Sequence, residues 1–189
     1  MKILLFLLVS FSVAAQNPIH WDGKYELQLS DFKAADTQIG DTDKYGIALG
    51  GGMEFLFSMS RAEFMFTKNF NSKVSNTFDP ISSSITAPNQ EIANQIVAFA
   101  RYAFDLQELY ARKLRESLYL GKGTFSDASF FEPSAREIQR QYDQRYNSVA
   151  KLTDLGRKAE LLAAQHELLK REINDMADFC KECKVRKKK

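Results

Sequence analysis

The sequence contains few of the residues from which most active sites are built: it has two histidines, His20 and His166, and two cysteines, Cys180 and Cys183, among 189 residues. A Ser-His-Asp or Cys-His site would need one of these histidines beside a nucleophile, and neither has the local signature of such a site. We therefore interpret both histidines as residues of the surface or of the edge of the core.

Neither sign of charge is in excess, because 26 lysines and arginines stand against 24 aspartates and glutamates. This balance creates no strong field toward nucleic acid or a membrane, so no nucleic-acid partner is predicted. The one block of like charge is the basic tail at residues 184–189, KVRKKK. We interpret it as a solvated chain end, with a contact to an anionic surface as the alternative.

The first fifteen residues, MKILLFLLVSFSVAA, have one lysine before an apolar run and a small-residue exit. Val13 and Ala15 satisfy the rule for signal-peptidase cleavage, which predicts a signal peptide at 1–15 and a mature chain beginning near Gln16. The run is shorter than the about 20 apolar residues of a membrane-spanning helix. A buried first strand or an uncleaved anchor is the alternative interpretation.

We therefore expect an exported protein of the periplasm or the extracellular space. Residues 16–183 have the length of a single domain with its own core, and no transmembrane segment is expected after cleavage. No cysteine lies near the cleavage point, so lipoprotein attachment is not indicated. The partner is expected to be an envelope or extracellular protein that the sequence does not name.

The two cysteines form a C-x-x-C close to the C-terminus, in FCKECK. In an exported chain we expect Cys180 and Cys183 to form a small disulfide ring that caps the last helix. A redox role is the alternative, but oxidoreductase C-x-x-C motifs open a helix behind a strand, whereas this one ends a helix.

Residues 89–118 have the pattern of one long amphipathic helix, with Asn89 as its expected cap. Apolar residues recur at steps of three and four, which places them on one side at about 100° per residue. The opposite side carries charged residues of mostly alternating sign, which predicts a solvated face held by ion pairs. The apolar set is Ile92, Ile96, Phe99, Ala103, Leu106, Tyr110 and Leu114, and the charged set is Arg101, Asp105, Glu108, Arg112 and Glu116.

The N-terminal half has strand patterns instead, at residues 25–29, 45–49, 53–59 and 62–66, with the glycine triplet at 50–52 as a turn. After the long helix, Ser134 and Glu137 have the spacing of a capping box, and a break at Thr153 and Gly156 precedes a last helix at 159–179. The expected fold class is α+β: a small antiparallel sheet packed on the long central helix, with C-terminal helices.

The segment at 98–116, AFARYAFDLQELYARKLRE, resembles the active-site helix of a bacterial family of predicted secreted zinc-dependent proteases of unknown function. That helix reads roughly A-H-E-Q-x-H-F-D-I-x-E-x-Y-A-R-K-L-R. Weaker likenesses lie at Trp21 with residues 29–33 and at residues 76–80, in the same order along the chain. The matching helix residues are Phe104, Asp105, Glu108, Tyr110, Ala111, Arg112, Lys113 and Leu114.

The residues that would bind the metal in that family have other residues at the matching positions of this chain. The two histidines fall on Phe99 and Ala103, the catalytic glutamate falls on Ala100, and a further histidine of a Y-D-x-x-T-x-H segment falls on Ser148. Two histidines at i and i+4 can share a zinc ion and the glutamate can activate its water, whereas Phe and Ala can do neither. No metal or other cofactor is therefore predicted.

The resemblance thus implies an exported, non-catalytic relative of a zinc-protease-like family that acts as a binding or structural protein in the cell envelope. The alternative is a secreted hydrolase whose active site has moved. A cleft that holds His166 would favour the hydrolase, and a site filled by Phe99 would favour the binding protein. Restoring the two histidines and the glutamate of the family motif, as Phe99→His, Ala103→His and Ala100→Glu, is expected to regain at most weak zinc binding. Adding Ser148→His should improve that binding.

Overall fold

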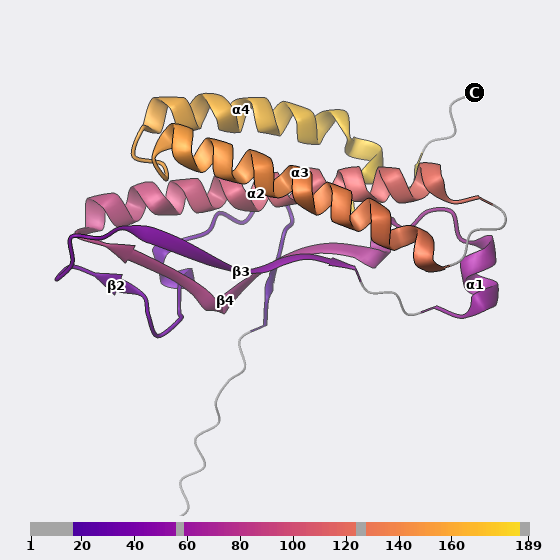
Figure 1. Cartoon of the computed structure of the whole chain (residues 1–189), viewed down its shortest axis with the longest axis horizontal. Coiled ribbons are helices and arrows are strands. Elements are labelled where there is room, and N and C mark those ends of the chain that lie inside the picture. Colours follow the sequence, from indigo (N-terminus) through magenta and orange to yellow (C-terminus); the bar gives the residue numbers. More distant parts are fainter. Residues whose placement is uncertain (1–16, 56–58, 124–127, 186–189) are drawn as a thin grey trace, which may run out of the picture.

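The computed structural model describes residues 17–55, 59–123 and 128–185, so the predicted signal peptide and residues 186–189 of the basic tail lie outside the described residues. The fold is α+β, as predicted, with a small sheet, a long helix and C-terminal helices (Figure 1). The strands are β1 (Ile19–His20), β2 (Gln38–Ile39), β3 (Gly46–Phe55) and β4 (Val74–Ala87). The α-helices are α1 (Arg61–Phe66), α2 (Gln90–Gly121), α3 (Phe131–Thr153) and α4 (Ala159–Asp175). Short 3-10 turns lie at Leu29–Asp31, Asn71–Lys73, Ala128–Phe130 and Ala177–Phe179.

The sheet is built on β4, which pairs with each of the other described strands. Strands β1 and β3 run antiparallel to it, whereas β2 runs parallel. The sheet is therefore mixed, and the expectation of a purely antiparallel sheet was wrong for β2. The parallel pairing is possible because more than thirty residues of chain, including β3 and α1, separate β2 from β4 and can reverse its direction.

Two of the expected strands have other structures. Residues 25–28 form a loop that leads into a 3-10 turn, in which Asp31 accepts hydrogen bonds from the Gln28 amide at 2.7 Å and the Tyr25 hydroxyl. Residues 62–66 lie in α1, where Ser60 Oγ accepts from the Glu63 amide at 3.1 Å and caps the helix. In both places a side chain that binds the backbone locally outweighs the strand pattern.

The glycine triplet lies inside β3 and is not the turn that the sequence suggested. A Cβ atom on Gly51 would lie 2.4 Å from the carbonyl oxygen of Thr77 on β4, so the residue must be glycine for the strands to pair. The register shifts between Ala48 and Gly50, as in a β-bulge. The glycines therefore permit close contact between two strands.

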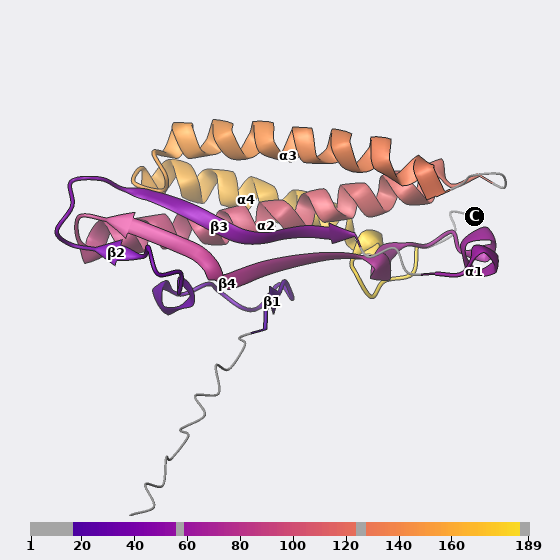
Figure 2. The same cartoon turned by 60° about the horizontal axis from the view of Figure 1, so that its bottom comes forward.

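The central helix α2 lies between the sheet and the pair α3 and α4 (Figures 1 and 2). Its predicted cap is confirmed, because Asn89 Oδ1 accepts from the Ile92 amide at 2.9 Å. The predicted break between the last two helices is also confirmed, at residues 154–158. The capping role of Ser134 was wrong, because α3 begins at Phe131 and the Ser134 hydroxyl instead accepts from Ser117.

The predicted disulfide is confirmed, since Cys180 and Cys183 are bonded directly after the last 3-10 turn. The backbone carbonyl of Cys183 accepts hydrogen bonds from the side-chain amides of Asn69 at 3.1 Å and Asn71 at 2.9 Å. The ring is therefore docked onto the segment that precedes β4. Within the described ranges, no helix is long and apolar enough to cross a membrane.

A group of buried and half-buried tyrosines between α2 and α3 gives a prediction for alkaline pH. Burial raises the pKa of Tyr102, Tyr110, Tyr142 and Tyr146 above the ordinary value of 10.0. The unfolded chain loses its phenolic protons near that pH while the folded chain keeps them, so stability is complete below it and falls as pH rises further. We expect these four phenols to ionise together with loss of helical circular dichroism. Ionisation of all seven tyrosines near their ordinary pKa, with the helices intact, would contradict this.

Candidate functional site

The positions that carry zinc ligands in the resembling family are filled with packed hydrocarbon. Phe99 and Ala103 are 0% and 1% exposed and belong to one apolar cluster, which α3 helps to form. The Phe99 ring packs against the Tyr146 ring with centroids 5.4 Å apart. Ala100 is also 0% exposed but lies in the second cluster, with residues of β4 such as Phe78. The structure thus places Phe99 and Ala103 together on one side of α2 and Ala100 on another.

Ser148, the fourth position that matches a metal-site residue of the resembling family, does not face Phe99, Ala100 and Ala103. Ser148 is exposed on α3, whereas Tyr146 and Val149 on the same helix pack into the core that contains Phe99. Because helical residues two apart point about 200° from each other, Ser148 lies on the face away from Tyr146. Among the described residues, no group of three or more His, Cys, Asp or Glu side chains could hold a metal ion.

The charged side of α2 is covered by other parts of the chain, and the prediction of a solvated face was wrong. Glu108 and Arg112 are 2% and 7% exposed, and Arg115 is fully buried. The expected pair of Glu108 and Arg112 is formed at 2.9 Å. Arg101 instead lies 3.6 Å from Glu26, and Asp105 pairs with a residue of α4. The N-terminal segment thus supplies Glu26, α4 supplies His166, and the C-terminal segment contacts Arg115 through the Phe179 carbonyl.

Trp21, Asp105 and His166 form a hydrogen-bonded chain across three elements. Trp21 Nε1 donates to Asp105 Oδ1 at 2.7 Å, and His166 Nε2 donates to Asp105 Oδ2 at 2.6 Å. Trp21 is fixed by its own amide, which donates to the Asn76 carbonyl on β4 at 3.1 Å. The His166 ring lies edge-on to Tyr102 of α2 at 5.8 Å. One carboxylate on α2 thus fixes the N-terminal segment on one side and α4 on the other.

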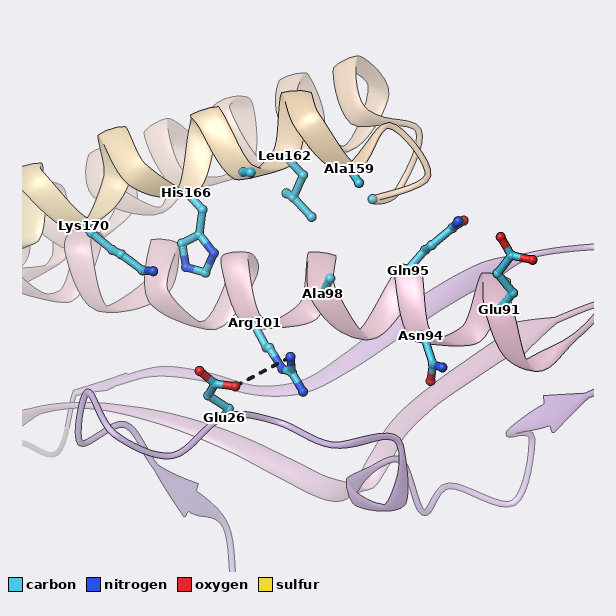
Figure 3. A pocket seen from close by; sticks show the side chains of 12 residues that line it. Glu26, Glu91, Asn94, Gln95, Ala98, Arg101, Ala159, Leu162, His166 and Lys170 are labelled. Carbon is cyan, nitrogen blue, oxygen red and sulfur yellow. Dashed lines mark ion pairs between the residues drawn. The ribbon is translucent and has the colours of Figure 1, made fainter.

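His166 stands at the wall of a groove of about 520 Å³ between α2 and α4 (Figure 3). Ala98 of α2 and Ala159 and Leu162 of α4 give the groove an apolar part. Arg101 and Lys170 give it a cationic end, where Figure 3 marks the ion pair of Arg101 with Glu26. We call this cavity the α2–α4 groove.

A smaller cavity of about 190 Å³ adjoins the groove and shares Arg101, His166 and Lys170 with it. Asp105 lines this smaller cavity, so the Asp105–His166 pair is accessible from it. At the opposite end of the groove, Gly156 fixes how closely the break after α3 approaches α2. A Cβ on Gly156 would lie 2.2 Å from the Gln95 carbonyl oxygen, and its φ of +93° also favours glycine.

A third cavity, of about 620 Å³, lies beside Trp21 and is lined by Arg112, Arg115 and Cys180 among others. Arg115 Nη1 donates to Glu108 Oε1 at 2.8 Å and to the Phe179 carbonyl at 3.0 Å, and Nη2 donates to the Val74 carbonyl at 2.8 Å. The buried arginine therefore joins α2 to the start of β4 and to the segment just before the disulfide.

The Asp105–His166 pair has the geometry of an acid–base dyad without a covalent nucleophile. A carboxylate that accepts from Nε2 orients the imidazole and leaves Nδ1 as the ring atom able to accept a proton. Among the described residues that line the groove and its smaller neighbour, none is Ser, Thr or Cys. The pair can therefore orient a ligand or act on a water molecule, but it does not face a serine or cysteine nucleophile.

Sequence reasoning placed His166 at the surface or core edge, and its side chain is 19% exposed. It missed the partner of His166, because Asp105 is 61 positions away in the sequence and no local motif links the two residues. Trp21 and Asp105 were both singled out by the family resemblance, although not as neighbours. Their presence in that resemblance was the one signal that could have drawn attention to this site.

Comparisons of the chain with protein-family models, with curated proteins and with solved structures each find no match. The resemblance to a zinc-protease-like family therefore rests on the residues of the motif alone. The function must accordingly be inferred from the cavities and the side chains that line them.

Proposed function

We propose that this is an exported, non-catalytic binding protein of the cell envelope, a relative of zinc-protease-like proteins that binds a partner in the α2–α4 groove. The observation that carries the proposal is that Phe99, at the position of a zinc ligand in the resembling family, is packed in the core, while an open groove lies along the same helix. The hydrogen bonds of Trp21 and His166 to Asp105 hold the groove wall in place without a partner. A preformed wall lowers the entropic cost of binding.

The groove has the properties of a site for a segment of another protein. Its volume of about 520 Å³ lies within the range of ordinary ligand pockets. The apolar part at Ala98 and Leu162 can receive one apolar side chain, and the polar rim at Arg101 and Lys170 can fix its orientation. A small apolar centre with a charged rim is typical of protein recognition sites.

The test fills the groove while leaving the fold intact. Ala163 is exposed and lines the groove, whereas Ala164, the next residue, is exposed and does not. We expect Ala163→Trp to reduce the capture of envelope proteins by the immobilised protein at least tenfold, a loss of about 1.4 kcal/mol, while Ala164→Trp captures the same set as the unmodified protein. Quantitative mass spectrometry of the captured proteins measures the difference. Equal capture by both tryptophan variants would contradict the groove as the binding site.

A hydrolase with a relocated active site is the second candidate, and the position of His166 at two cavities favours it. In that case Nδ1 of His166 would take a proton from water while Asp105 holds the ring. Hydrolysis of a casein or ester substrate by the unmodified protein, reduced at least 100-fold by His166→Gln and by Asp105→Asn, would establish this function and overturn the non-catalytic one. We expect no such activity from the unmodified protein.

A further inference from the structure

The cavity beside Trp21 is separate from the α2–α4 groove and contains an unusual arrangement of buried charge. Arg112 and Arg115 both donate to the same atom, Glu108 Oε1, at 2.9 and 2.8 Å. The exposed fractions of the three side chains are 8%, 1% and 3%, so two positive charges and one negative charge lie in the interior. Burial of an uncompensated charge is costly, and an anion placed beside it would offset that cost.

The two arginines differ in how completely they are bonded. Arg115 uses all three of its nitrogens, on Glu108 and on the carbonyls of Val74 and Phe179. Arg112 uses Nε on Glu108 and Nη1 on the Ile173 carbonyl, at 2.9 and 2.8 Å. Among the described residues, Nη2 of Arg112 has no hydrogen-bond partner. Arg112 lines the cavity, so this donor is the natural contact for a ligand.

We propose that this cavity binds a small organic carboxylate, which Arg112 recognises and the ring of Trp21 packs against. The guanidinium of Arg112 lies over the Trp21 ring at 5.4 Å, so the donor and an apolar surface are presented together. Cys180 of the disulfide and Lys181 complete the lining toward the C-terminal segment. A planar carboxylate matches a guanidinium, and a compact apolar body suits the indole surface.

The charge of the whole lining favours a ligand with one negative charge over a phosphate or sulfate dianion. Besides Glu108, two further acidic residues line the cavity, Asp22 and Glu182, together with one lysine, Lys181, and one histidine, His20. The three carboxylates of the lining are therefore matched by its two arginines and one lysine, and only the buried part has an excess of positive charge. A second negative charge on the ligand would face Asp22 or Glu182 and be repelled.

The experiment uses the fluorescence of Trp21, which is the only tryptophan in the chain. The purified protein is titrated with cyclohexanecarboxylate, with its neutral analogue cyclohexanecarboxamide and with sulfate. We expect a saturable change with the carboxylate and no saturation with the amide or with sulfate. No saturation with the carboxylate up to about 10 mM, or equal dissociation constants for carboxylate and amide, would overturn the proposal.

Arg112→Gln is expected to weaken carboxylate binding about tenfold to 100-fold, the value of a hydrogen bond between charged groups. This variant leaves Arg115 to balance Glu108, so the fold should survive, and circular dichroism checks that it does. Lys181→Gln, at a surface position, provides a second variant with an expected weakening of about threefold. Arg140→Gln is the matched control, because Arg140 is exposed on α3. Equal binding by the Arg112 and Arg140 variants would overturn the assignment of the site.

Discussion

Replacing Glu108 with glutamine should lower the free energy of unfolding by about 3–5 kcal/mol, because breaking a buried ion pair leaves uncompensated charge in the core. In the native protein, one oxygen of Glu108 accepts from both Arg112 and Arg115, and no side chain of the three is more than 8% exposed. Glutamine keeps the size of the side chain and an acceptor oxygen but removes the negative charge. Urea unfolding followed by circular dichroism measures the loss.

The same substitution at Glu137 is the control, because Glu137 pairs with Arg140 at 2.7 Å on the exposed surface of α3. We expect Glu137→Gln to leave the urea midpoint unchanged, as is usual for surface pairs. Combining Glu108→Gln with Arg112→Met should recover part of the lost stability, since it removes one of the two unpaired guanidinium groups. Similar small shifts for Glu108→Gln and Glu137→Gln would show that the buried cluster contributes no more than a surface pair.

The parts of the fold that could be predicted from the sequence are those specified by local signals. The helical period over 89–118, the cap at Asn89 and the break near Gly156 are each contained within a few residues, and the structure confirms all three. The disulfide between Cys180 and Cys183 is equally local, because the two cysteines are three positions apart in the sequence. Short-range geometry is enough to determine these features.

The parts that failed depend on what lies opposite in the folded chain. The glycine triplet looks like a turn until Thr77 of β4 is placed against Gly51. The charged side of α2 looks solvated until Trp21 and the segment around Phe179 cover it. A helix with charge on one side has the same sequence pattern whether water or buried partners satisfy that charge. The pairing of Asp105 with His166 was unpredictable for the same reason.

The side chains of the zinc-protease-like motif make contacts that the sequence pattern does not reveal, and these contacts affect which function is inferred. The motif that suggested a zinc protease includes Asp105, Glu108 and Arg112. In this chain Asp105 pairs with His166 of α4 and Arg112 donates to the Ile173 carbonyl of α4, whereas Glu108 accepts from Arg112 and Arg115 within α2. Contacts within α2, and contacts of α2 with the N-terminal segment and α4, therefore account for these three side chains. Such residues can therefore serve the packing of a helix and need not indicate a metal site.

The triple substitution Phe99→His, Ala100→Glu and Ala103→His should unfold the domain and create no zinc site. These changes place the histidines and the glutamate of the zinc motif on α2. The sequence alone suggested weak metal binding for this variant, but the structure places Ala100 at 0% exposure in the cluster that faces the sheet. A glutamate there would bury a carboxylate without a partner, at a cost of several kcal/mol. Loss of the Phe99 ring from its contact with Tyr146 adds about 3 kcal/mol, within a total stability of about 5–15 kcal/mol.

Ser148→His tests whether α3 can contribute a ligand to a metal site on α2. Because Ser148 is exposed on the far face of α3, a histidine there should change neither the thermal midpoint nor the zinc content, and it should not rescue the triple variant. Thermal unfolding and elemental analysis of the unmodified protein, the triple variant and the variant with all four changes test this. One equivalent of zinc in a folded triple variant, or a gain of zinc from Ser148→His, would mean that α2 and α3 can still assemble a metal site. The proposed non-catalytic function would then lose its main support, because a catalytic zinc needs three protein ligands that this packing holds apart.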